Sequence, residues 1–132
     1  MIYDEILLEH NTHPEHSGEL SGKDVKKCKL FNASCGDKLE ISLKIQGGKI
    51  VDGSFSGVGC AISKASADIM LGEMIGKSLE EAKELAKKFF EQFDADETAE
   101  TPELGEANAL LEVRRMPARA KCAKLAWTIF ES

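Results

Sequence analysis

The sequence predicts an α+β fold, in which helices pack on one face of a small antiparallel β-sheet. Apolar residues alternate with polar ones from Leu39 to Ile45, as in a half-buried strand, and Gly47-Gly48 follows as a turn signal. Further along the chain, apolar residues recur at helical spacing instead. Strands followed by a run of helices are typical of the α+β class.

The N-terminal third is expected to hold one helix and a β-hairpin. Helical spacing predicts an amphipathic helix over 2–10, which stops near Pro14 because a proline disfavours helical geometry in the residue before it. A polar stretch reaches about Lys27. The alternating residues then form the first strand, and 49–55 forms the returning strand of the hairpin.

Two helices are expected after the hairpin. Residues 61–75 have one apolar face, and Gly76 is a plausible stop. Ser78 and Glu81 have the spacing of a capping box and predict a second helix that reaches about Phe93.

The last third is expected to begin with a loop and end with a helix. Residues 94–103 are acidic and polar, and a short helix near 104–111 is possible. Pro117 suits the first turn of a final helix. The apolar stripe of that helix consists of Ala123, Trp127 and Phe130.

Composition restricts the class of protein. A length of 132 residues predicts a single domain over 1–132, and 42% apolar residues are enough for a core. A net charge of −6 argues against nucleic acid or an anionic membrane as a partner, and no stretch approaches the roughly 20 apolar residues of a membrane span. The N-terminus lacks the pattern of a signal peptide, so we expect a cytoplasmic protein.

Three of the four cysteines occur in special local sequence. Cys35 opens the tight run Cys-Gly-Asp, Cys60 follows a glycine-rich approach to a predicted helix, and Cys122 lies in a basic segment. Three thiolates with the carboxylate of Asp37 make four ligands, the number that a tetrahedral zinc site takes. The carboxylate would be the most exchangeable ligand, because it is hard where thiolates are soft. On spacing alone, three small buried core cysteines remain an equal alternative.

The remaining candidate ligands have simpler interpretations. Cys28 lacks special context and is predicted to be a packing residue. His10, His13 and His16 cluster, but the proline that follows His13 breaks the helix that would align them. A polar helix end is therefore the preferred interpretation over a metal site.

The three cysteine blocks resemble those of IscU/NifU-type iron–sulfur scaffolds. The blocks are Asn-Ala-Ser-Cys-Gly-Asp at 32–37, Gly-Val-Gly-Cys-Ala-Ile-Ser at 57–63 and Pro-Ala-Arg-Ala-Lys-Cys-Ala at 117–123. The N-terminal stretch 3–18 is similar too. Lys121 stands where IscU-type scaffolds carry histidine, and a longer connection, including the acidic 94–106, separates the second and third cysteines. Both details resemble the SufU-like branch.

That resemblance implies a zinc-dependent sulfurtransferase. Its zinc ligands would be Cys35, Asp37, Cys60 and Cys122. Cys35 would accept persulfide sulfur from a pyridoxal-phosphate-dependent, SufS-like cysteine desulfurase, and Arg119 would support the acceptor thiol or the partner contact. The sulfur would then pass to a downstream iron–sulfur scaffold. On docking, a partner side chain would take a zinc position and free Cys35.

Two alternatives stay open. The same cysteines could hold a transient 2Fe–2S cluster, because thiolates suit iron as well as zinc. The loss of histidine at Lys121 argues against that scaffold role. The protein could also be a non-catalytic interaction module stabilised by structural zinc, although a closed structural site needs no exchangeable ligand such as Asp37.

Overall fold

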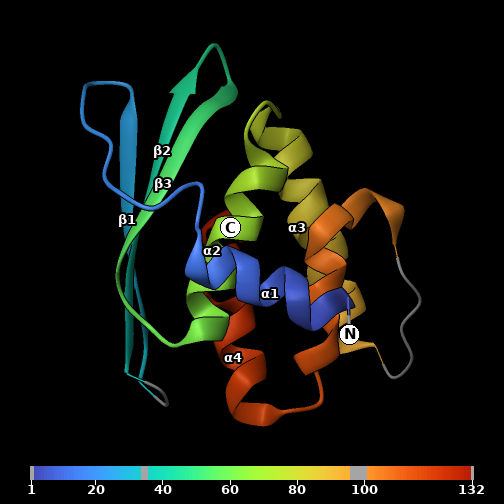
Figure 1. Ribbon diagram of the computed structural model, residues 1–132. Coiled ribbons are helices and arrows are strands. Elements are labelled where there is room, and N and C mark those ends of the chain that lie inside the picture. Colours follow the sequence, from blue (N-terminus) through green and yellow to red (C-terminus); the bar gives the residue numbers. More distant parts are fainter. Residues whose placement is uncertain (1, 34–35, 96–100, 132) are drawn as a thin grey trace.

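A computed structural model describes residues 2–33, 36–95 and 101–131, and it confirms the predicted α+β fold. In chain order the elements are α1 (Ile2–Thr12), β1 (Val25–Asn32), β2 (Asp37–Gln46), β3 (Lys49–Val58), α2 (Ala61–Met74), α3 (Leu79–Asp94), the 3-10 segment η1 (Pro102–Val113), α4 (Pro117–Leu125) and the 3-10 segment η2 (Ala126–Phe130). Figure 1 shows the sheet as one layer with the helices gathered on one side.

The three strands form an antiparallel sheet in the order β1-β2-β3. The predicted hairpin is confirmed: Gly47 and Gly48 form its turn with φ values of 60° and 76°, which glycine adopts readily. β3 continues to Val58 rather than stopping at residue 55. Cys28, Ile41 and Phe55 lie side by side across the sheet.

β1 was not anticipated from the sequence, because it lacks the alternation of a half-buried strand. Seven of its eight residues are half-buried or exposed and show no period of two, and only Asn32 at its end is buried. Three of its residues are lysines, Lys26, Lys27 and Lys29. Lysine-rich edge strands of this kind discourage unwanted pairing between sheets.

The two central helices begin as predicted. Cys60 is the N-cap of α2, and Ser78 caps α3 in a complete capping box with Glu81. Between them Gly76 has φ 96°, which confirms it as the stop. α3 ends at Asp94, which is the first residue of the predicted loop 94–103.

The C-terminal part is less regular than a single final helix. The short helix expected near 104–111 is a longer 3-10 segment, kinked at Gly105 with φ 54°. α4 begins at Pro117, as predicted, but ends at Leu125, where the chain tightens into η2. Residues 96–100 of the predicted acidic loop lie outside the described residues.

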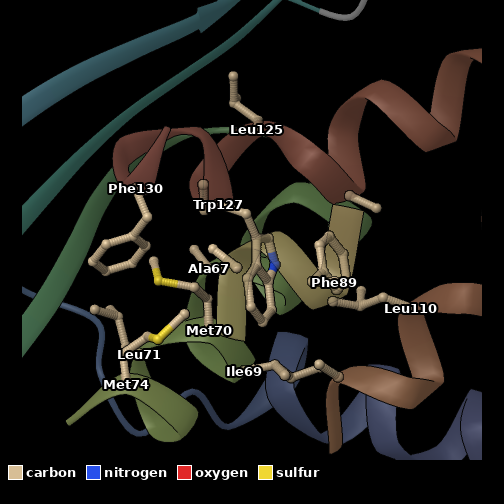
Figure 2. Packing of buried hydrophobic residues seen from close by; sticks show 14 of the residues in the cluster. Ala67, Ile69, Met70, Leu71, Met74, Phe89, Leu110, Leu125, Trp127 and Phe130 are labelled. Carbon is tan, nitrogen blue, oxygen red and sulfur yellow. The ribbon is translucent and has the colours of Figure 1, made fainter. Parts of the chain in front are cut away.

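The core lies between the sheet and the helices, and Trp127 is at its centre (Figure 2). Its ring stacks on that of Phe89, with centroids 4.0 Å apart and planes inclined by 7°. The indole Nε1–H donates to Ser66 Oγ at 3.0 Å, and that hydroxyl donates to the backbone oxygen of Ala123 at 2.5 Å. α2 is thereby tied to α4 next to Cys122. In the described residues, no helix has the length and apolar character to cross a membrane.

The three histidines do not converge on one point. His10 contacts two carboxylates, Asp68 Oδ2 at 2.6 Å from Nδ1 and Glu106 Oε1 at 3.0 Å from Nε2. His13 lies 3.7 Å from Glu9, and the backbone N–H of His16 donates to the other oxygen of Asp68 at 2.8 Å. Burial lowers the pKa of His10, but its two carboxylate partners outweigh that effect and raise the pKa above 6.5.

Candidate metal centre

Three segments that are far apart in the sequence meet at one end of the sheet. Asp37 is the first residue of β2, Cys60 caps α2, and Cys122 lies within α4. One ligand atom from each, a carboxylate oxygen or a Sγ, lies within 4.8 Å of the other two. In the described part of the chain no second group of histidine, cysteine, aspartate or glutamate side chains converges in this way.

Asp37 is buried, with 1% of its surface exposed, and its carboxylate is held by three donors. The backbone N–H of Cys60 donates to Oδ1 at 2.9 Å, and Ser63 Oγ donates to the same oxygen at 3.3 Å. Asn32 Nδ2 donates to Oδ2 at 3.3 Å. A buried carboxylate needs such partners, and here they fix its orientation towards the two sulfurs.

Cys60 has two roles at the start of α2. As the N-cap, its Sγ accepts a hydrogen bond from the backbone N–H of Ser63 at 3.4 Å. Burial alone would raise the pKa of this thiol, but donors from Ser63 and the neighbouring Cys122 lower it overall. The helix start therefore favours a thiolate, the form that binds metal.

The glycines before Cys60 let β3 and its continuation approach the site closely. Gly57 has φ 118°, and a Cβ there would lie 2.1 Å from the backbone oxygen of Lys38. A Cβ on Gly59 would lie 2.4 Å from Ser63 Oγ and 3.3 Å from Asp37 Oδ1. Side chains at either position would push Cys60 away from the carboxylate.

Cys122 is the ligand candidate that α4 contributes, and it is buried, with 1% of its surface exposed. Pro117 starts the helix that carries it, and the hydrogen bond from Ser66 to Ala123 fixes that helix one residue further on. Asn32 Nδ2 donates to Cys122 Sγ at 3.6 Å. One amide of β1 therefore contacts two of the three candidate ligands.

The donor set fits a zinc ion. Tetrahedral zinc takes thiolates at about 2.3 Å and carboxylate oxygens at about 2.0–2.2 Å, so ligand atoms stand roughly 3.5–4 Å apart. The limit of 4.8 Å between the atoms of Asp37, Cys60 and Cys122 is compatible with that spacing. Two sulfurs beside a buried carboxylate also form a site that a cation would neutralise.

The structure brings together three of the four predicted ligands, whereas Cys35 lies outside the described residues. The turn beside it is described: Gly36 has φ 73°, and its N–H donates to the Asn32 oxygen at 2.8 Å. Arg119 is exposed on α4, three residues before Cys122.

The basic segment around Cys122 does not act as one patch. Lys121 is exposed on α4, like Arg119. Lys124, however, lies 3.6 Å from Asp94 and over the ring of Phe93, and Arg114 donates to the backbone oxygen of Ala95. Those two side chains therefore contact the end of α3.

The prediction for Cys28 was wrong. This residue is exposed rather than packed in the core. It pairs with Ile41 and so points to the helix side of the sheet, where it lines a groove between the sheet edge, α3 and η2. Its exposure depends on how far the helices extend over the sheet, which the sequence around Cys28 does not indicate.

Two residues of the site were missed by the sequence analysis. Asn32 orients Asp37 and Cys122, and Ser63 contacts both Asp37 and Cys60. Ser63 could have been found, because it lies three residues after Cys60, just inside the helix predicted over 61–75, where a backbone N–H commonly bonds to the N-cap side chain. Asn32 gave no such signal, since its strand was not predicted.

Comparison with known sequences identifies a family and close relatives. The profile of the NifU-like N-terminal domain matches residues 2–127. The iron–sulfur cluster assembly scaffold protein IscU of Streptococcus pyogenes is 41% identical over 126 residues, covering 96% of this chain and 78% of the relative. The zinc-dependent sulfurtransferase SufU of Bacillus subtilis is 34% identical over 130 residues, covering 98% of this chain and 87% of the relative.

A solved structure is also similar. The crystal structure of a protein from Fervidobacterium islandicum, described as an iron–sulfur cluster assembly scaffold for the SUF system, is 35% identical. It superimposes with a TM-score of 0.87 and covers 99% of this chain and 95% of its own.

Proposed function

The chain belongs to the NifU-like N-terminal domain family, and on that basis we propose that it is a zinc-dependent sulfurtransferase of iron–sulfur cluster assembly. The observation that carries the proposal is that ligand atoms of Asp37, Cys60 and Cys122 lie within 4.8 Å of one another at one end of the sheet. A mixed set of two thiols and one carboxylate suits zinc with an exchangeable position.

The four candidate ligands would have different roles in the reaction. Asp37, Cys60 and Cys122, together with Cys35 two residues before Asp37 in the sequence, would hold the ion. When bound, zinc would supply positive charge that keeps the thiols deprotonated at neutral pH. The carboxylate, bound by three donors, would keep its orientation when a neighbouring thiolate leaves the site.

Cys35 would accept the sulfur from the persulfide of a cysteine desulfurase. Its thiolate attacks the terminal sulfur of that persulfide, so a new S–S bond forms on Cys35. The S–S bond of the desulfurase breaks, and the desulfurase cysteine leaves as a thiolate. The exchange needs no oxidant, and a second thiol can then take the sulfur from Cys35 by the same reaction. Arg119, which is exposed one helical turn before Cys122, would contact the partner or support the acceptor thiol.

The experiment is desulfurase turnover with a thiol reductant and a substoichiometric amount of the zinc-loaded protein. We expect strong acceleration that is lost in Cys35→Ala. Cys28→Ala is the matched control, because that thiol is exposed and outside the candidate metal centre. Full acceleration by Cys35→Ala, or none by the unaltered protein, would overturn the proposal.

A cluster scaffold is the second candidate, because IscU-named relatives reach 41% identity. Anaerobic reconstitution separates the two functions: a scaffold forms a 2Fe–2S cluster and transfers it to an apo-ferredoxin. Asp37→Cys distinguishes the third possibility, a structural zinc module. A purely structural site should tolerate this change, whereas an exchanging site should slow because a fourth thiolate binds zinc more firmly.

A further inference from the structure

A groove separates the free edge of the sheet from the C-terminal segment, well away from the candidate metal centre. It encloses 350 Å³ between the helix side of β1 and β2, the start of α3, and η2. Its apolar floor includes Ile41, Leu43 and Ile45 of β2 and Phe130 of η2. Lys26 and Lys83 stand at its rim, and no acidic residue lines it.

The strand register explains why the groove is open. Lys26 pairs with Leu43 and Cys28 pairs with Ile41, and directly paired residues of an antiparallel sheet point to the same face. Leu43 and Ile41 are buried beneath the helices, so Lys26 and Cys28 also point to the helix side, yet both are exposed. The helical layer therefore stops short of β1 at this point.

The lysines of β1 discourage pairing with a neutral or basic strand, but the edge beside the groove can receive a strand whose acidic side chains offset that charge. β1 pairs with β2 on one side, and among the described residues no strand pairs with its other side. An edge strand directs alternate N–H and C=O groups outward, where an extended peptide can bond to them. The side chains of an added strand would point alternately into the groove and away from it.

We propose that β1 and this groove bind an extended peptide segment of a partner protein, in which every second side chain faces the groove and these groove-facing side chains are aliphatic and acidic in turn. The groove-facing aliphatic side chains match the floor of Ile41, Leu43 and Ile45, and the groove-facing acidic ones match Lys26 and Lys83. Lys27 also lines the groove, but by the strand register its side chain points to the opposite face of the sheet, where it lies 4.0 Å from Glu40. The positive rim stands out on a chain of net charge −6, so it attracts a partner that the rest of the surface repels.

The first experiment uses a fluorescein-labelled short peptide in which every second residue is valine or glutamate in turn and the residues between them are threonine, titrated with the full chain by fluorescence anisotropy. We expect saturable binding that weakens as salt rises. The bound peptide should also slow alkylation of Cys28 by a maleimide, measured by mass spectrometry of the fragment that contains it. A peptide with lysine in place of glutamate should bind about tenfold more weakly.

Two kinds of variant test the placement. Lys26→Glu combined with Lys83→Glu should weaken binding about tenfold, whereas Lys88→Glu should not, because that exposed side chain lies on α3 outside the groove. Peptides N-methylated at alternate positions test the backbone pairing. Methylation of the residues whose N–H groups face β1 should abolish binding, and methylation of the residues between them should leave binding intact.

Several outcomes would overturn the proposal. Absence of binding at the highest soluble protein concentration would do so, as would equal binding by the lysine-containing peptide. Displacement of the peptide by laurate, with no effect of N-methylation, would make the groove a site for amphipathic small molecules instead. Self-association that is lost in Lys26→Glu with Lys83→Glu, seen by sedimentation, would make a second copy of this chain the occupant.

Discussion

Replacing Asn32 by alanine should weaken zinc binding without unfolding the protein. The Asn32 amide donates to Asp37 Oδ2 at 3.3 Å and to Cys122 Sγ at 3.6 Å, so one side chain orients two candidate ligands. Removing a partner of a metal ligand typically costs ten- to hundredfold in affinity. Both contacts are long, and hydrogen bonds weaken with distance. We therefore expect the lower limit, a dissociation constant raised about tenfold, which corresponds to about 1.4 kcal/mol.

The assay is competition for zinc against a chromophoric chelator at neutral pH. Asn108→Ala is the matched control, because its amide donates to the backbone oxygens of Thr101 and Gly105, away from the site. Asn32→Asp should bind zinc more weakly than the native protein as well, since it places an acceptor against the carboxylate of Asp37 instead of a donor. An affinity for Asn32→Ala within about twofold of the native value, or an equal loss in the control, would refute the reasoning.

Three further predictions concern stability and pH. Ser66→Ala leaves the buried indole N–H of Trp127 without its acceptor, and urea unfolding followed by fluorescence of this single tryptophan should show a loss of about 2 kcal/mol; a loss below about 0.5 kcal/mol would contradict the role of the bond. Gly57→Ala should lower the free energy of unfolding by about 3 kcal/mol or more, because the φ of Gly57 is 118° and the added Cβ meets backbone. Thermal unfolding measures this loss, and in that assay Gly72→Ala within α2 should be tolerated; equal effects of the two variants would count against backbone strain at Gly57. The pKa of His10 is raised in the folded protein, so the contribution of His10 to the free energy of unfolding is complete below pH 6.5 and is lost as pH rises through the raised value. His10→Gln should remove this pH dependence of the unfolding free energy, and a variant with the same pH dependence as the native protein would refute the role of His10.

Local signals predicted the elements whose sequence carries its own boundaries. Gly47 and Gly48 marked the hairpin turn, Ser78 and Glu81 marked the start of α3, and Pro117 marked that of α4. In each case the geometry depends on a few neighbouring residues. Such elements are readable because no distant contact is needed to define them.

The features that were missed depend on the tertiary arrangement. β1 has no alternation because its outer edge and part of its helix side are exposed, so Lys26, Cys28 and Lys29 gave no period of two. Asn32 became visible as a site residue only once this strand placed it beside β2. The meeting of Asp37, Cys60 and Cys122 was anticipated through resemblance, since their spacing alone left the packing alternative open.

Cys60 belongs to both the candidate metal centre and the N-terminus of α2, so metal binding and the stability of the folded chain would be coupled. An ion that binds the folded chain and not the unfolded one stabilises it by mass action. Here that ion would join residues from the sheet, the central helix and the C-terminal helix. A chain that lost it would expose itself more often to proteases, so cellular zinc supply would govern how much of this protein persists as well as how much is active.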